Sequence, residues 1–539
     1  MPQQPLSPTP VRSRALATIL IVGIGILRIV YLAYNCPLEL APDEAHYWDW
    51  SRHLDWSYYS KGPLVAWIIR ASCELFGSLS VRLTGTEMLA VRLPAVLFGS
   101  LFLMSLYVLA RRVLKNERVA LAIVLVALTM PAVTAGSTLM TIDAPFVCLW
   151  GWALVVGHRA ISGEGKGWEW PVLGLLIGLG ILAKYTMVLF IPCLGLFLIA
   201  TPATRHLLKQ RGFWTMSFVA AFCCLPIVIW NWQHDWVTLR HTAESHAAAA
   251  GWSWLGPLNY LGTQLAIMLG FWFCVWVASI WKYRPGKETR TEFVYLGWLS
   301  APMFVVFWLF SFTNGGGEPN WPVPAYISGA ILSAGFLADY FKNARPLFRR
   351  WNLVNVVGFS LFGLVVSIVA CEPRIIDSFL VPIAGPPRPG NQNPIRRLDP
   401  TIRLRGWRHL AGEVDAVRAS LRSEGIEPLV ASGGWTLTSE FAFYCDGHPD
   451  ALSFGLAFGD RHSEYDIWHP NPISDPAAFV GRTIVVVGAN REMLSPAFDR
   501  VDEPHLVRYA ENGQDIYQWD VTVGRGFHGF PPTDRTAGY

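Results

Sequence analysis

The residues best suited to chemistry open a polar, aromatic-rich stretch at 42–70, PDEAHYWDWSRHLDWSYYSKGPLVAWIIR. Asp43 and Glu44 are adjacent carboxylates that follow the first long apolar run of the chain. A carboxylate can take a proton from a hydroxyl group, and acids at the mouth of a membrane helix are costly enough to indicate a functional site. The alternative is structural, because Asp43, after Pro42, could cap a short helix that begins around Glu44.

Three further motifs place polar residues beside apolar runs. Asp143 lies in TIDAP at the start of one run, where an acid could also serve as a favourable helix N-terminal charge. Lys184 separates two short apolar segments, and it could simply extend its amine toward water. Glu318 and Asn320 lie in the loop GGGEPNWP, in a setting that requires no helix cap. All four are candidate site residues.

Cationic residues accompany these acids. Arg92 lies near the start of the second apolar run, and Lys61 lies in the first loop. An arginine within a span costs about 2.5 to 3.5 kcal/mol, so Arg92 should face either a carboxylate partner or a polar cavity. In the second case Lys61, Arg92 and Lys184 would surround an anion. This combination suits group transfer from a phosphate leaving group, in which a carboxylate takes the acceptor proton and cations stabilise the departing phosphate.

These residues lie beside long apolar runs, which the composition identifies as membrane helices. The chain has 539 residues, of which 52% are hydrophobic and only 15% charged, and its mean hydropathy is +0.33. Such values are typical of an integral membrane protein. Its apolar runs have the length of bilayer-spanning helices, about 20 residues each. We expect about eleven spans, at approximately 15–34, 88–110, 118–135, 144–158, 171–183, 185–200, 213–231, 258–281, 293–312, 322–341 and 352–371.

The composition changes after the last of these runs. From residue 372 onward the chain is richer in Pro, Asp, Arg and His and has no apolar run of span length. We therefore expect a transmembrane domain at 1–371, with an outer loop at 35–87 that carries the site, and a soluble domain at 372–539. Alternating helices and strands predict a small α/β fold for the soluble domain, with helices near 407–422 and 437–444 and strands near 428–431 and 483–487.

Basic residues indicate how the spans are oriented. They cluster in alternate connecting segments, at 12–14, 111–118, 159–166, 205–211, 282–290 and 342–350. The positive-inside rule then predicts a cytoplasmic N-terminus, with the C-terminal domain and every motif above on the outer face. This parity requires 171–200 to form two short helices or a re-entrant pair. The aromatic segments of the first loop are predicted to be interfacial amphipathic helices that are too short to span.

Other sequence features exclude several kinds of site. The nine cysteines show no C-x-x-C spacing, and no Cys/His cluster of zinc type is present. Cys36 and Cys73 lie in or beside the first loop and could form a disulfide in an oxidising compartment. No cofactor is certain, although a divalent metal is possible. No nucleic-acid partner is implied.

The order of the motifs resembles that of a known enzyme family. The motifs are PDEAHYWDWS and YYSKGPLVAW in the first loop, RLPAVLFG at 92–99, TIDAP at 141–145, LAKYT at 182–186 and EPNWPVPAYIS at 318–328. Together they are similar to the GT-C membrane glycosyltransferases of the dolichyl-phosphate-mannose protein mannosyltransferase superfamily. The resemblance covers about 1–370 and is strongest to the bacterial branch of lipid A aminoarabinose and galacturonic acid transferases.

The resemblance implies a function and a set of roles. It implies a polyprenyl-phosphate-linked sugar as donor, direct transfer to a hydroxyl of a lipid, glycan or protein, and a periplasmic site in the bacterial inner membrane. By motif, Asp43 is the general base, and Glu44 and Asp143 are supporting acids for acceptor or metal. The expected phosphate-binding residues are Lys61, Arg92 and Lys184. The expected sugar or acceptor contacts are Tyr58, Tyr59, Glu318 and Asn320.

Two other functions fit parts of the sequence. A transporter or flippase for polyprenyl-linked sugars would also need apolar grooves and buried charge, although no internal repeat is present. A membrane-tethered sensor would use the C-terminal domain to bind a ligand, but it leaves the acidic membrane loops unexplained. The identities of the sugar and of the acceptor stay open at this point.

Overall fold

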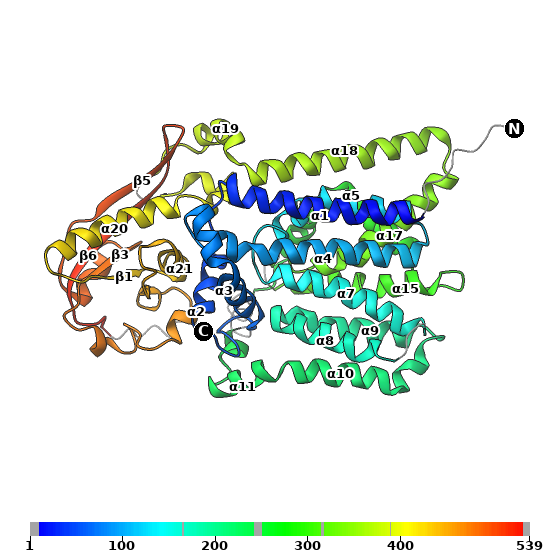
Figure 1. The fold of residues 1–539 in the computed structure, drawn as a ribbon, viewed down its shortest axis with the longest axis horizontal. Coiled ribbons are helices and arrows are strands. Elements are labelled where there is room, and N and C mark those ends of the chain that lie inside the picture. Colours follow the sequence, from blue (N-terminus) through cyan, green and yellow to red (C-terminus); the bar gives the residue numbers. More distant parts are fainter. Residues whose placement is uncertain (1–9, 164–166, 242–250, 314–316, 389, 532–539) are drawn as a thin grey trace.

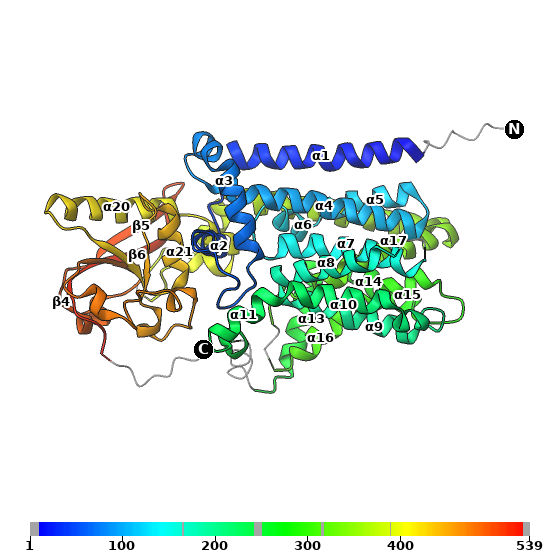
Figure 2. The same ribbon diagram turned by 60° about the horizontal axis from the view of Figure 1, so that its bottom comes forward.

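The protein consists of a long helical bundle with a strand-containing domain at one end (Figure 1). The structure is a computed structural model, and it describes residues 10–163, 167–241, 251–313, 317–388 and 390–531. The N-terminal helix begins at the end of the bundle opposite the C-terminal domain, and the short helix Pro42–Arg52 of the first loop lies between bundle and domain (Figures 1 and 2). The predicted fold class is confirmed: a polytopic helical membrane protein with a C-terminal α/β domain.

The described part of the chain before residue 385 is mainly helical. Their bounds are α1 Pro10–Tyr34, α2 Pro42–Arg52, α3 Leu64–Thr84, α4 Met88–Leu114, α5 Glu117–Leu128, α6 Pro131–Gly136, α7 Asp143–Ile161, α8 Glu169–Ala183, α9 Phe190–Ala200, α10 Arg211–Cys223, α11 Leu225–Gln233, α13 Leu255–Ile267, α14 Phe271–Lys282, α15 Thr291–Trp298, α16 Ala301–Phe310, α17 Val323–Asn343, α18 Pro346–Cys371 and α19 Arg374–Ala384.

Seven described helical segments are long and apolar enough to cross a membrane. An eighth is added if α13 and α14, which meet at a bend of 108°, are one broken span. Several expected spans are shorter or broken helices, so the number eleven stays a prediction. The prediction of two helices within 171–200 is confirmed, because α8 ends at Ala183 and Lys184 adopts an extended conformation before the next helical turn.

Local sequence explains where the long helices turn. The α4 helix ends with Arg111 and Arg112 in its last turn, followed by Lys115 in the left-handed conformation. Asn116 then caps α5 by accepting hydrogen bonds from the backbone amides of Arg118 and Val119. Cations at a helix C-terminus and an asparagine at the next N-cap are both favourable, so the chain reverses at this basic turn.

One prediction for the first loop is wrong. The helix α3 has 21 residues and is long and apolar enough to span a membrane, whereas the loop segments were expected to be too short. The reason is that apolar residues at Leu75, Leu79 and Leu83 continue the helix beyond the charged residues. Both views nevertheless draw α3 crosswise to α4, at the end of the bundle beside α2 (Figures 1 and 2).

The C-terminal domain is built on a six-stranded sheet. The strand order is β2-β1-β3-β6-β4, and β5 also pairs with β6. The β1 strand is parallel to β2 and β3, and β6 is antiparallel to β3, β4 and β5. The bounds of its main elements are α20 Trp407–Ser423, β1 Leu429–Ser432, α21 Trp435–Tyr444, β2 Leu452–Ser453, β3 Ile484–Val487, α22 Arg491–Leu494, β4 Phe498–Val501, β5 His505–Glu511 and β6 Gln514–Phe527.

The first loop and the C-terminal domain share a hydrophobic core. Trp48 and Trp50 of α2 belong to the same buried cluster as Trp407 of α20 and Phe441 of α21. Glu39 adds a polar link, because its carboxylate accepts a hydrogen bond from the Trp407 backbone amide at 2.5 Å. The C-terminal domain is thus packed directly on the loop that carries the acidic pair. Cys36 and Cys73 are free thiols in this structure.

Candidate active site

The acidic pair lies at the N-terminus of α2, and its two members have different surroundings. Pro42 is the first helical residue and Ala41 is the N-cap. Glu44 reaches back to accept a hydrogen bond from the Ala41 backbone amide at 2.9 Å. The capping role that the sequence suggests for Asp43 is therefore filled by Glu44. Among the described residues, no hydrogen bond holds the carboxylate of Asp43, a half-buried residue.

Glu44 and Arg92 form a fully buried ion pair. Arg92 Nη2 lies 2.7 Å from Glu44 Oε2, and the two side chains are 0% and 1% exposed. The remaining polar atoms are also satisfied, because Arg92 donates to the carbonyls of Leu38 and Glu39, and the Met140 amide donates to Glu44 at 2.7 Å. The structure favours the ion-pair interpretation of Arg92 and gives the pair a positioning role for α2.

Three of the predicted motifs meet at Asp143, the first residue of α7. Lys184 Nζ lies 2.7 Å from Asp143 Oδ1, and Asn320 Nδ2 lies 2.6 Å from Asp143 Oδ2. Asp143 and Lys184 are 23% and 9% exposed. The sequence-based expectation that these distant motifs converge is thus met for these three residues. Glu318 of the same loop is exposed, and residues 314–316 of that loop lie outside the described residues.

Asp43 and Lys61 lie in the electrostatic field of the same cluster. Burial raises the pKa of Asp43, and the charges that most oppose this rise are those of Arg403, Lys61 and Arg461. Burial lowers the pKa of Lys61, and repulsion from Lys184 lowers it further. A carboxylate with a raised pKa is a stronger base once it is ionised, so Asp43 suits proton abstraction.

Tyr58 and Tyr59 of the first loop are enclosed by protein. Tyr58 is 0% exposed, stacks on Trp50 with ring centroids 4.4 Å apart, and donates its hydroxyl proton to the Trp50 carbonyl. This packing leaves no surface for a substrate, so the expected substrate contact of Tyr58 is not supported. The Tyr59 backbone amide donates to Glu464, and its hydroxyl lies 3.1 Å from His241 Nδ1.

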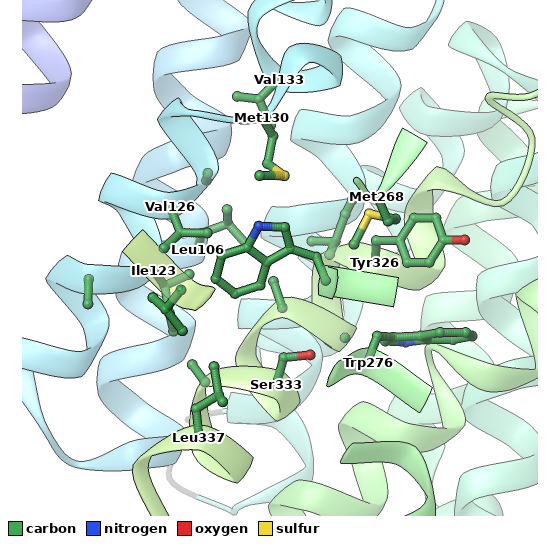
Figure 3. A pocket seen from close by; sticks show the side chains of 18 of the residues that line it. Leu106, Ile123, Val126, Met130, Val133, Met268, Trp276, Tyr326, Ser333 and Leu337 are labelled. Atoms are coloured by element: carbon green, nitrogen blue, oxygen red, sulfur yellow. The ribbon is translucent and has the colours of Figure 1, made fainter. Parts of the chain in front are cut away.

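An apolar cavity of about 370 Å³ lies within the bundle (Figure 3). Its lining comes from α4, α5, α14 and α17, among others, and small side chains of α17 at Ala330, Ala334 and Ala338 form one wall. One end reaches Val323, whose backbone amide donates to the carbonyl of Asn320, while the other reaches Phe341 near the far end of α17. The cavity therefore extends along the bundle from the vicinity of the polar cluster.

The polar cluster does not resemble a metal site. Across the described ranges, no group of three or more His, Cys, Asp or Glu residues is arranged to hold a metal ion. Both carboxylate oxygens of Asp143 already accept hydrogen bonds, from Lys184 and Asn320. A divalent metal would have to displace these donors, so the residues present do not fit a metal ligand set.

Sequence reasoning missed the contribution of the C-terminal domain. Arg403 and Arg461 act on Asp43, and Glu464 holds the loop beside Lys61. Each lies more than 300 residues after the first loop and carries no motif of its own. A pattern that predicts a soluble tail says nothing about where the surface of that tail meets the membrane domain.

Comparison with known proteins agrees with this architecture. Residues 60–230 match the family described as dolichyl-phosphate-mannose-protein mannosyltransferase. The lipid A galacturonosyltransferase RgtD of Rhizobium johnstonii is 30% identical over 351 residues, which are 64% of this chain and 70% of that protein. The undecaprenyl phosphate-alpha-4-amino-4-deoxy-L-arabinose arabinosyl transferase of Edwardsiella ictaluri is 27% identical over 380 residues, 65% of each chain.

A solved structure supports the fold over nearly the whole length. The crystal structure of ArnT from Cupriavidus metallidurans bound to undecaprenyl phosphate superposes with a TM-score of 0.57 at 16% identity, covering 95% of this chain and 99% of that one. Fold and relatives define a glycosyltransferase of the bacterial inner membrane. The chain belongs to the dolichyl-phosphate-mannose-protein mannosyltransferase family of GT-C enzymes.

Proposed function

We propose that this glycosyltransferase moves a sugar from a polyprenyl-phosphate donor to a hydroxyl group of a lipid or glycan acceptor, with lipid A as the preferred acceptor class. The named relatives act on undecaprenyl-phosphate-linked and lipid A substrates. The observation that carries the proposal is the meeting of Asp143, Lys184 and Asn320 beside Asp43 and Lys61. Together these residues supply acids and cations at one end of an apolar bundle.

The proposed chemistry is a direct displacement at the anomeric carbon. Asp43 takes the proton of the acceptor hydroxyl as its oxygen forms a bond to the sugar C1 atom. The bond between C1 and the phosphate oxygen breaks, and the electron pair leaves with the polyprenyl phosphate. Lys61 and Lys184 stabilise the charge on that leaving group, because fixed cations in a water-poor site interact strongly with a developing anion.

Other predicted residues take supporting roles. Asp143 and Asn320 hold Lys184 in place, because the lysine donates to Asp143 and the same carboxylate accepts from Asn320. Glu44 and Arg92 fix the start of α2, since their buried pair joins it to α4. We therefore propose that Glu44 and Arg92 position Asp43 and do not contact the phosphate or the acceptor directly.

The cavity offers a place for the lipid chain of the donor. A polyprenyl chain is apolar and flexible, and it needs a groove that removes it from water. Ala330, Ala334 and Ala338 form one wall of the cavity, and their small side chains leave such a groove open. We propose that the cavity receives part of the polyprenyl chain while its phosphate lies at the polar cluster.

The orientation follows from the charge pattern. We propose a cytoplasmic N-terminus and a periplasmic C-terminal domain at 372–539, with the transmembrane domain at 1–371. The basic turn between α4 and α5 then faces the cytoplasm, as the positive-inside rule requires. Reaction of a cysteine introduced at Met493, which is 37% exposed, with an impermeant thiol reagent in intact spheroplasts tests this orientation.

The function is tested with purified protein in lipid vesicles. Incubation with a radiolabelled polyprenyl-phosphate sugar and lipid A should yield labelled lipid A and free polyprenyl phosphate in equal amounts. Movement of the labelled lipid to the inner leaflet without sugar transfer would instead support the flippase alternative and contradict the proposal.

A further inference from the structure

A segment of the C-terminal domain, residues 461–465, lies against the first loop. Glu464 accepts a hydrogen bond from the Tyr59 backbone amide at 2.5 Å. The ring of His462 stacks on the Tyr59 ring with centroids 6.4 Å apart. Tyr59 is two residues before Lys61. These contacts fix the start of the segment, which is Arg461, beside the part of the loop that carries a proposed phosphate-binding lysine.

Arg461 is also linked, through Trp435, to the helix that carries Asp43. Its guanidinium lies 5.2 Å from the centroid of the Trp435 ring, and that ring lies 5.1 Å from the ring of His46. His46 follows Asp43 by three residues on α2, so both side chains belong to one face of the helix. A guanidinium stacked on an aromatic ring keeps its edge N–H groups available for an anion.

Arg461 has no carboxylate partner among the described residues. Other arginines of the same domain, such as Arg405 and Arg525, form ion pairs with carboxylates. Among the described residues no carboxylate lies within ion-pair distance of Arg461, and its side chain is exposed. Its charge nevertheless acts on both Asp43 and Lys61. An unpaired arginine is therefore held at the edge of the candidate active site.

We propose that Arg461 is a phosphate-binding residue that the C-terminal domain contributes to the active site. The inference rests on the proposed function and deepens it. The phosphate could belong to the polyprenyl donor or to the lipid A acceptor, since both present the same anionic oxygens. In either case the two edge N–H groups of the guanidinium would form a bidentate contact, which a lysine cannot reproduce.

The test separates the two sources of phosphate. The variants are Arg461→Ala, Arg461→Lys and, as a matched control, Arg482→Ala, which removes another exposed arginine of the same domain. One arm measures binding of undecaprenyl phosphate alone to the purified protein. The other measures KM for lipid A and for lipid A from which the phosphates have been removed. Melting temperatures report whether each variant is folded.

Arg461→Ala should weaken one of these interactions by about tenfold or more, the effect of losing a hydrogen bond to a charged group. Arg461→Lys should recover only part of the loss, and Arg482→Ala should match wild type. If undecaprenyl phosphate binds more weakly, the phosphate that Arg461 binds belongs to the donor. If KM rises for lipid A but not for lipid A without its phosphates, the phosphate that Arg461 binds belongs to the acceptor. Wild-type values in both arms, with a wild-type melting temperature, would overturn the inference.

Failure of the proposed function gives a different result. If wild-type protein transfers no sugar, the proposed reaction fails. The binding arm still decides whether Arg461 contacts the phosphate of the undecaprenyl lipid. If wild-type protein transfers sugar and Arg461→Ala is unchanged in both arms, only the inference about Arg461 fails.

Discussion

Lys184 and Asp143 join two helices at the candidate active site through a 2.7 Å ion pair. Lys184 lies in the break between α8 and α9, and Asp143 begins α7. Because Lys184 itself is extended at this break, its side chain can reach Asp143 on the neighbouring helix. Asp143 in turn holds Asn320, so one carboxylate organises three separate segments.

The Asp143–Lys184 pair should act as a unit in catalysis. We expect Lys184→Met to lower kcat/KM by about 100-fold, because a cation near the leaving phosphate is lost. Asp143→Asn should also lower it, since the lysine loses its anchor. The double variant should be no worse than Lys184→Met alone, because residues in contact do not contribute independently. Additive losses in a double-mutant cycle would contradict the proposed coupling.

The buried Glu44–Arg92 pair should matter for stability. Glu44→Gln leaves Arg92 buried without its counter-charge, which should lower the free energy of unfolding by about 3–5 kcal/mol. The control is Glu74→Gln, which removes an exposed pair with Arg70 and should cost less than about 1 kcal/mol. Thermal melting in detergent measures both. Equal melting temperatures for the two variants would contradict a positioning role for Glu44.

The stability that protonated Glu464 contributes to the fold should fall as the pH rises. Burial raises the pKa of Glu464 from 4.5 to about 8, so the folded protein keeps a proton there that the unfolded chain releases above its ordinary pKa. Stability from this group is then complete below pH 4.5 and is lost progressively up to about pH 8, by at most about 1.4 kcal/mol per pH unit.

Glu464→Gln should remove this part of the pH dependence. The amide oxygen can still accept the hydrogen bond of the Tyr59 amide, and no proton is exchanged in this range. Glu503→Gln, at a carboxylate 81% exposed, should leave the wild-type profile unchanged. Melting temperatures measured from pH 4.5 to pH 8 compare the three proteins. Identical profiles for wild type and Glu464→Gln would show that Glu464 holds no proton in the folded state.

The cavity prediction is tested by filling it. Ala334→Phe should raise KM for a long polyprenyl-phosphate donor several-fold while leaving a short-chain donor nearly unchanged, because only the long chain reaches that wall. The control is Val365→Phe on α18, where the side chain is 56% exposed on the outer surface of the bundle. Equal effects of Ala334→Phe on both donors would place the lipid chain elsewhere.

Much of the architecture was predictable because the bilayer imposes it. The apolar runs of α1, α4 and α18 predict their helices, and the placement of basic residues predicts that Asp143, Lys184 and Asn320 share one face. The length and course of α3 were harder to predict, because charged residues interrupt its apolar face.

Partners within the site could not be predicted from the local sequence. Nothing around Arg92 distinguishes a phosphate-binding arginine from one paired with Glu44, since that choice depends on how α2 packs against α4. Arg461 was missed for a similar reason: its position depends on the docking of the whole C-terminal domain, and one exposed arginine has no pattern that reports such docking.

The proposed mechanism depends above all on Asp43, which takes the acceptor proton. It is tested most directly by the single-turnover rate of sugar transfer from a polyprenyl-phosphate donor by Asp43→Asn protein, with melting temperature and undecaprenyl phosphate binding as checks on folding. We expect a rate about 100- to 10,000-fold below wild type, the usual contribution of a general base, with binding and stability kept. A rate equal to that of wild type in folded protein would contradict it.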